Sequence, residues 1–486
     1  DQKHPIQSHP WSLAHSLYLL LLLPLVAVLA SGFFTPTQLE RTFLGEFDDK
    51  VERLRNTDGA KIIVIGGSSA AFGVDAELLE KTLGMPVVNF GLYATLGTKT
   101  MLDYSKSGIG EGDIIVIAPE MNAQTWSLYF NAEAMWQAVD GHFSLLRYLD
   151  SDDIPAMLGG FWRFASSKLQ YMREGTVLDP DGIYNASSFD DYGFIRYNRT
   201  KDYNTMAGGY DSGMIIDFNL EMISEDFIDY VNDYVKYAQK KGATVYLGFC
   251  PMNEMAIDPD TTLETLEAFT DFLSERFDCE VLGDPNEYLY RSGYFFDSNF
   301  HTNSAGAVLH TRQLAIDLAA KMGEITVDIE VPDEPEIPDN PDEPDVYEYD
   351  ENEVYFTYNV TDFGVYITGV TELGKTQTTL RTPVAYDGKK VVAFTADTFA
   401  GCGTLAELFV TDNIGQIPDG TFRGAESLEK IHILAVDPDK CTVNNVSGGA
   451  REGLPERSRF YVPEESYANF VTNYFWGPYA NYIVAE

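Results

Sequence analysis

The chain has 486 residues, enough for two or three domains, and 45% of them are hydrophobic, which excludes a wholly disordered protein. With 33 Lys and Arg against 75 Asp and Glu, the formal charge is −42, which repels phosphate backbones and excludes a nucleic-acid binder. The four cysteines form no C-x-x-C pair, so neither a zinc ribbon nor a dense disulfide framework is available.

An uncharged apolar run near the N-terminus predicts a membrane-spanning helix. Residues 16–34 are long enough to cross a ~30 Å hydrocarbon core, which divides the start into a short cytoplasmic end (1–15), an anchor (16–34) and a juxtamembrane stretch (35–57). The alternative is a cleaved secretory signal ending at Ala30, but the run continues to Phe34. A weak charge bias favours a single-pass cell-membrane protein whose later domains are extracellular.

Residues 58–325 alternate apolar strands with helical segments, which predicts an α/β domain with a parallel sheet covered on both faces. Aromatic and Gly/Asp/Asn-rich sequence at about 124–217 breaks the alternation and indicates an insertion over one end of the sheet. The expected strands are 61–65, 86–90, 113–118, 243–250 and 279–282, and the expected helices are 76–83, 224–240, 263–277 and 304–322.

An acidic, proline-rich linker at 326–354 separates this domain from residues 355–486. In the last segment, Phe399-Ala-Gly-Cys-Gly-Thr-Leu405 matches Phe422-Arg-Gly-Ala-Glu-Ser-Leu428 at an offset of 23 residues. A fixed period in the low twenties is typical of a leucine-rich solenoid, and the segment resembles bacterial BspA-like leucine-rich repeats. A chance similarity of two hairpins is the alternative.

The first strand leads into Gly66-Gly67-Ser68-Ser69 and a helix. A serine at this turn presents its hydroxyl beyond the carboxyl end of a parallel strand, beside helix-start amides that can stabilise an oxyanion. A simple helix cap is the alternative interpretation.

Asp297 and His301 lie together before the last helix and can supply the base and orienting carboxylate that a serine nucleophile needs. Of the seven histidines, only His142, His301 and His310 fall in the α/β domain, and His301 alone is outside both the insertion and a helix. The sequence therefore favours Ser68, Asp297 and His301 as a catalytic set, without a metal or cofactor.

These blocks resemble the SGNH (GDSL-like) hydrolase superfamily, in which a serine follows strand one and an Asp and a His share a late block. The resemblance implies a three-layer, doubly wound parallel sheet, with Ser68 as nucleophile and oxyanion donors among Ser69, Ala94, Gly97 and Asn122. The third block departs from the family pattern, with Ala118-Pro119-Glu120-Met121-Asn122 in place of G-x-N-D. The late block has three residues between Asp297 and His301 instead of two.

The layout is most similar to the envelope branch of that superfamily, the alginate O-acetyltransferase and DltD-like proteins. This resemblance implies a membrane-anchored, extracellular serine esterase or O-acyltransferase. Its substrates would be acyl esters of cell-envelope polysaccharide or cell-wall polymer, with acetyl as the favoured acyl group. A transferase would also need a membrane acyl-donor protein as partner. The alternative function is a non-catalytic adhesion or scaffold protein that binds through its repeat domain.

Overall fold

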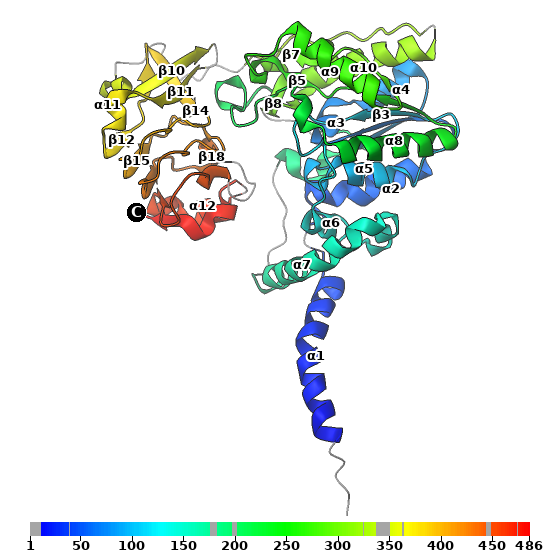
Figure 1. Cartoon of the computed structure of the whole chain (residues 1–486), viewed down its shortest axis with the longest axis horizontal. Coiled ribbons are helices and arrows are strands. Elements are labelled where there is room, and N and C mark those ends of the chain that lie inside the picture. Colours follow the sequence, from blue (N-terminus) through cyan, green and yellow to red (C-terminus); the bar gives the residue numbers. More distant parts are fainter. Residues whose placement is uncertain are drawn as a thin grey trace, which may run out of the picture.

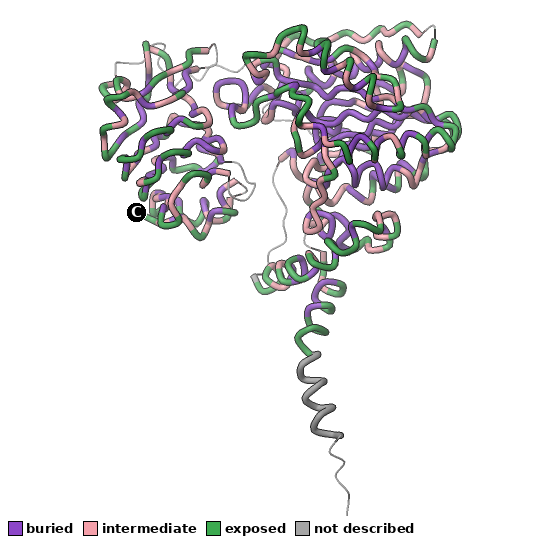
Figure 2. The backbone as a smooth tube through the Cα atoms, viewed as in Figure 1, coloured by how far each residue is buried: buried purple, intermediate pink, exposed green. Residues whose placement is uncertain are grey.

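The computed structural model describes residues 11–37, 39–174, 182–196, 202–323, 325–336, 350–361, 364–443, 449–473 and 475–486, and the side chains of the first helix from Leu23 onward. Figure 1 shows a long first helix that leads to a layered body of helices and strands, with the C-terminal strands forming a smaller body beside it. Buried residues concentrate along the strands of the larger body (Figure 2).

The largest body is built on a five-stranded parallel sheet in the order β2-β1-β3-β4-β6. In β1, Ile62 and Val64 pack toward α4 and α10, whereas Ile63 and Ile65 pack toward α2, α5 and α8. Both faces of the sheet are therefore covered. The bounds are β1 Ile62–Gly66, β2 Val87–Gly91, β3 Ile114–Ala118, β4 Thr244–Leu247, β6 Glu280–Val281, α2 Phe47–Asn56, α4 Ala76–Leu83, α5 Thr98–Ser105, α8 Glu225–Lys240 and α10 Ser304–Met322.

The predicted positions of the five strands and of α4, α8 and α10 are confirmed, with α4 and α10 matching the expected ranges to the residue. Local caps explain the agreement. Asp75 accepts a hydrogen bond from the Leu78 amide at 3.0 Å, and Asn303 accepts one from the Gly306 amide at 3.0 Å. Helix α9 (Leu263–Arg276) starts with a capping box at Thr262.

The insertion expected at 124–217 contributes α6 (Ala132–Ala138), α7 (Ile154–Glu174) and several single 3-10 turns. Two of its pieces, 175–181 and 197–201, lie outside the described residues. The piece between them, 182–196, lies against α3 (Ser68–Gly73), where the Ile195 amide donates to the carbonyl of Ala71 at 3.0 Å.

The N-terminal helix α1 (Trp11–Phe34) corrects the membrane prediction. Among the described residues, no helix combines the length and apolar character needed to cross a membrane. The end of α1 packs on α7 instead, where Phe33 stacks on Phe161 with ring centroids 5.0 Å apart. Lys168 on α7 donates to the carbonyl of Gly32 at 3.2 Å. The predicted membrane-spanning anchor at 16–34 and the single-pass membrane placement are therefore wrong.

The C-terminal segment forms two further sheets, in the orders β10-β11-β14-β16-β18 and β12-β15-β17-β19-β20. The 23-residue offset seen in the sequence is the register of a parallel ladder, since Leu408 pairs with Ile431 and Val410 with Ile433. The strands are β10 Phe356–Thr361, β11 Gly364–Val370, β12 Thr379–Arg381, β13 Ala385–Tyr386, β14 Lys389–Phe394, β15 Glu407–Val410, β16 Gln416–Ile417, β17 Lys430–Ile433, β18 Thr442–Val443, β19 Arg459–Val462 and β20 Ile483–Ala485, with helices α11 Glu372–Lys375 and α12 Tyr467–Thr472.

The two bodies meet at the end of the insertion. The buried Tyr366 of β11 donates its hydroxyl hydrogen toward the carbonyls of Ala207 and Tyr210, at 2.8 and 3.0 Å. Ser212 donates to the carbonyl of Phe394 on β14 at 2.9 Å. Of the predicted linker at 326–354, residues 337–349 lie outside the described ones.

The predicted fold class, an SGNH-like three-layer sheet with a transmembrane helix and a leucine-rich solenoid, is wrong. The described residues form a mixed α/β structure with several small sheets. Two-stranded sheets join β5 (Met252–Asn253) to β7 (Leu289–Tyr290) and β8 (Phe295–Ser298) to β9 (His301–Thr302). Antiparallel pairing of β10 with β11 and of β13 with β14 interrupts the regular parallel pattern. Strand pairing across the chain, which local patterns do not report, decides this difference.

Candidate active site

Ser68 is the first residue of α3 (Ser68–Gly73), directly beyond the carboxyl end of β1. Gly67 caps the helix, and a Cβ placed on it would approach Glu120 Oε1 to 2.5 Å. The glycine therefore lets the chain turn tightly against a neighbouring strand end. Ser68 is 7% exposed, so its hydroxyl lies in a largely dry environment.

His301 and Asp297 reach this serine from the β8–β9 hairpin. His301 Nε2 lies 2.8 Å from Ser68 Oγ, and His301 Nδ1 lies 2.8 Å from Asp297 Oδ1. The pairing register of the hairpin shifts between Phe295 and Ser298, which accommodates the additional residue between the acid and the base. The three side chains thus form a continuous hydrogen-bonded chain that can carry a proton away from the serine hydroxyl.

Asn299, inside the hairpin, points its side chain away from the hydrogen-bonded Ser68, His301 and Asp297 side chains and into the protein. Its Nδ2 donates to the carbonyls of Asp211 and Met214, both at 2.8 Å, and its Oδ1 accepts from the Asp211 amide at 2.8 Å. Asn299 is fully buried. These bonds fix the hairpin to residues 211–214, which are in turn held by the C-terminal body through Ser212.

Two aromatic residues complete the surroundings of His301. Phe72 of α3 stacks on the imidazole with centroids 4.0 Å apart and planes 2° apart, which restrains ring rotation. Tyr184, from the insertion, donates its hydroxyl hydrogen to Asp297 Oδ2 at 2.7 Å. Asp297 is therefore held on both oxygens, one by the base and one by a tyrosine.

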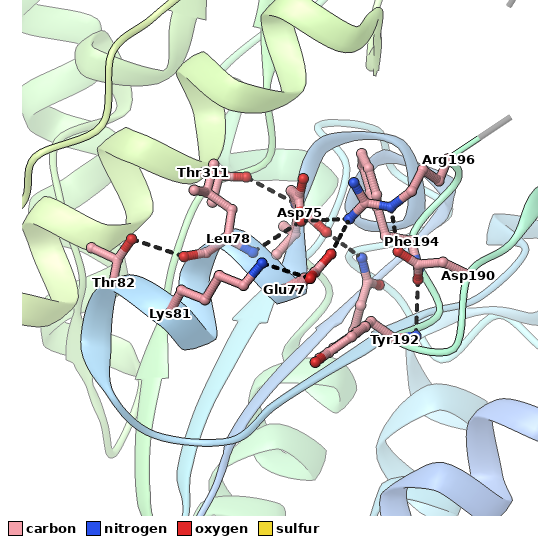
Figure 3. Close-up of polar contacts among 12 residues, drawn as sticks. Asp75, Glu77, Leu78, Lys81, Thr82, Asp190, Tyr192, Phe194, Arg196 and Thr311 are labelled. Atoms are coloured by element: carbon pink, nitrogen blue, oxygen red, sulfur yellow. Dashed lines mark hydrogen bonds and ion pairs between the residues drawn. The ribbon is translucent and has the colours of Figure 1, made fainter. Parts of the chain in front are cut away.

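Arg196 ties the segment that carries Tyr184 to α4. Its guanidinium contacts Asp75 at 3.1 Å, Glu77 at 3.2 Å and Asp190 at 2.9 Å. Figure 3 shows this network, in which the Asp75 amide also donates to Thr311 Oγ1 of α10 at 2.9 Å. The insertion is thus anchored on the helices that flank the main sheet.

The four residues expected to supply oxyanion donors each make a different contact. The Ser69 amide donates to Glu120 Oε1 at 3.0 Å, and the Gly97 amide is used in a turn, donating to the Ala94 carbonyl at 3.0 Å. Ala94 lies beside Gly67, with its Cβ 3.3 Å from where a Gly67 Cβ would be. Asn122 Oδ1 accepts from the Thr125 amide at 3.1 Å. Gly97 therefore offers no free amide, and a glutamate occupies that of Ser69.

Sequence reasoning missed three functional candidates, namely Glu120, Tyr184 and Phe72. Glu120 stands in the third block, where its departure from G-x-N-D was visible, but nothing in the sequence indicated that it would contact Ser69. Phe72 is four residues after Ser68, so helical spacing could have placed it beside the site. Tyr184 is one of 29 tyrosines and carries no local signal.

The other titratable groups of the α/β body are less suited to the chemistry. Burial lowers the pKa of His310 to about 3, so it is neutral and inaccessible. His142 lies 2.9 Å from Asp48, away from the serine. Burial raises the pKa of the Cys250 thiol well above its usual value, so it is not a thiolate nucleophile at neutral pH. Within the described ranges, no three His, Cys, Asp or Glu side chains gather as a metal site requires.

Comparison with known proteins adds little. No family model matches the chain, and no curated protein matches it. Among solved structures, the chain is similar to a leucine-rich repeat protein of T. pallidum (TpLRR), with 22% identity over 24% of this chain and a TM-score of 0.18. The match spans about half of that protein, 53% of its length. At this TM-score the likeness carries no argument about fold or function.

Proposed function

We propose that the chain is a serine ester hydrolase or O-acyltransferase. The observation that carries the proposal is the hydrogen-bonded chain from Ser68 through His301 to Asp297, with 2.8 Å at each step. Serine, imidazole and carboxylate in this order are the groups that acyl transfer through a covalent intermediate requires. The resemblance of the sequence blocks to SGNH hydrolases supports the same chemistry, with acetyl esters of a polysaccharide as the first substrates to test.

In this mechanism Ser68 Oγ attacks the ester carbonyl carbon while its proton passes to His301 Nε2. The carbonyl π pair moves to oxygen, then returns as the bond to the leaving alkoxide breaks, and His301 gives the proton to that alkoxide. The acyl-serine is released by water in a hydrolase, or by an acceptor hydroxyl in a transferase, with His301 again taking the proton. Asp297 orients the imidazole and stabilises its charged form.

The test compares Ser68→Ala with Ser69→Ala on a short-chain aryl ester, together with covalent labelling by a fluorophosphonate. We expect Ser68→Ala to abolish turnover and labelling, because it removes the hydroxyl that lies 2.8 Å from His301 Nε2. Ser69→Ala should keep a measurable part of both, since its backbone amide remains. Equal loss in both variants, or labelling at another residue in the wild type, would contradict the assignment of Ser68.

A second function, a non-catalytic adhesion or scaffold protein, is favoured by one observation. Glu120 Oε1 accepts from the Ser69 amide, and an ionised carboxylate there would oppose the negative oxygen of a tetrahedral intermediate. An inert site would leave binding to the C-terminal sheets. Folded wild-type protein that neither turns over esters nor reacts with fluorophosphonate at any pH would favour this second function.

A further inference from the structure

The sheet β12-β15-β17-β19-β20 carries a row of aromatic rings on the face opposite its buried core. Phe409, His432 and Tyr461 share one position in the parallel register, and the residue before each of them belongs to the core. The rings stack, with centroids 4.2 Å apart for Phe409 and His432 and 5.1 Å apart for His432 and Tyr461. Because His432 covers one face of Phe409, the face toward β12 is the one that remains for another contact.

A cavity of about 370 Å³ lies at this end of the row, where β12 runs beside β15 (Figure 1). Phe409 lines the cavity together with Arg381, its pairing partner on β12. Tyr355, Asn352 and Gln377 also line it, which adds a second aromatic residue and two residues with amide side chains. The volume is within the range of small-molecule sites, which combine apolar walls with a few polar groups.

Arg381 is the charged residue of this cavity. It is exposed, and its guanidinium makes no hydrogen bond or ion pair with any residue that the structure describes. Two other basic residues of the same sheet face have partners, since Lys430 lies 3.6 Å from Glu407 and Arg459 donates to the Ser458 carbonyl at 2.8 Å. The described side chains that line the cavity include no acid. In a chain with 75 Asp and Glu, this local charge favours an anionic ligand.

Asp350 is near enough to be affected by the charge of Arg381, but its carboxyl oxygens are held by other groups. They accept from Asn352 Nδ2 at 2.8 Å and from the Val384 amide at 2.9 Å. Burial raises the pKa of Asp350, and these hydrogen bonds together with the charge of Arg381 more than offset that effect, so the pKa is lowered. Among the described contacts, no ion pair joins Asp350 to Arg381, and the guanidinium keeps its donors for a ligand.

The polar side chains beside Arg381 also retain hydrogen-bonding capacity. Gln377 uses its Nε2 to donate to a backbone carbonyl at 3.2 Å, as Asn352 uses its Nδ2 for Asp350. Within the described part of the chain, the side-chain oxygens of these two amides accept no hydrogen bond, and the Tyr355 hydroxyl makes none. The cavity residues therefore supply both donors and acceptors, which a ligand with several hydroxyl groups uses together.

We propose that this cavity binds a uronic-acid residue of an acidic oligosaccharide, with its carboxylate on Arg381 and its sugar ring against Phe409. Arginine matches a carboxylate with two parallel hydrogen bonds, and the C–H face of a sugar ring packs on an aromatic ring. The sugar hydroxyls donate to the amide oxygens of Asn352 and Gln377. An inorganic anion would use Arg381 alone, and a neutral sugar would leave its charge unmatched. The inference does not depend on the ester chemistry at Ser68.

The experiment is isothermal titration calorimetry of the full chain at low ionic strength. The probes are trisaccharides of galacturonate, glucuronate and mannuronate, and the same trisaccharides with their carboxyl groups reduced to hydroxymethyl groups. We expect at least one uronate to bind. Its reduced form should bind about ten- to a hundredfold more weakly, which is the effect of losing a hydrogen bond to a charged group.

Three variants locate the binding. Arg381→Ala should weaken uronate binding by about the same ten- to hundredfold as reduction of the carboxyl groups. Phe409→Leu, which keeps an apolar side chain at the end of the row, should weaken it by about three- to tenfold because the flat ring is lost. Lys430→Ala is the matched control, because it removes the same charge from the same sheet face without lining the cavity, and it should leave the affinity nearly unchanged.

Three results would overturn the proposal. The first is no binding of any of the three uronates at millimolar concentration to protein whose thermal unfolding shows it to be folded. The second is an equal loss of affinity in Arg381→Ala and Lys430→Ala, which would mean that the uronate responds only to diffuse charge. The third is binding of a triglutamate peptide as tight as that of the uronate and equally dependent on Arg381, which would mean that the cavity selects a carboxylate and not a sugar. Ester turnover is not part of any readout, so failure of the proposed function leaves this test intact.

Discussion

Replacing Tyr184 with Phe tests whether the insertion contributes to the candidate site. The change removes one hydroxyl, which donates to Asp297 Oδ2 at 2.7 Å, and leaves the ring beside Phe72. A hydrogen bond to a charged group contributes about 1.5 to 3 kcal/mol. The side chain of Asp297 is 22% exposed, so water can replace part of the lost bond.

We therefore expect a loss of about 1 to 1.5 kcal/mol in transition-state stabilisation, because Asp297 holds the imidazole as it becomes charged. This corresponds to a decrease of about five- to tenfold in kcat, with KM nearly unchanged. The assay is steady-state hydrolysis of an aryl ester by the full chain, with thermal unfolding measured in parallel.

Tyr192→Phe is the matched control. Tyr192 belongs to the same described segment, but its ring packs under Arg53, 4.3 Å from the guanidinium, and does not contact Asp297. We expect wild-type kcat for this variant. Equal kcat for Tyr184→Phe and Tyr192→Phe, at equal stability, would refute the argument that Tyr184 positions Asp297.

Two further predictions concern the contact between the two bodies. Burial raises the pKa of Asp211 from 3.8 to about 6, so the folded state holds a proton that the unfolded state releases. The contribution of this group to the free energy of unfolding is therefore fully present below about pH 4 and is lost as the pH rises through about 6. Asp211→Asn should therefore stabilise the protein by about 1 to 2 kcal/mol at pH 7, which is less than the full pKa shift implies because the side chain keeps partial solvent contact. In urea unfolding, the variant's free energy of unfolding should change less between pH 4 and 6 than that of the wild type, and an equal pH dependence would contradict this. Tyr366→Phe, which loses the donor to Ala207 and Tyr210, should cost about 1 kcal/mol in thermal unfolding, and no change would show that water replaces the hydroxyl.

The sequence by itself determined the local elements and the residues at their ends. Continuous apolar runs marked the buried strands, caps such as Asp75 and Asn303 fixed helix starts, and the turn at Gly67 placed Ser68 at a strand end. The 23-residue offset of the repeat is the same spacing at which Leu408 pairs with Ile431. These features are readable because periodicity and capping depend on neighbours within a few residues.

The tertiary structure decided which distant residues meet. Glu120 reaches the Ser69 amide across 51 residues, and Tyr184 reaches Asp297 across 113. The apolar run at 16–34 looked like a membrane anchor, yet its end packs on α7 through Phe33. Composition and periodicity report that a side chain will be buried, but not by which partner. That choice depends on the path of the whole chain and on the pairing of strands that lie far apart in sequence.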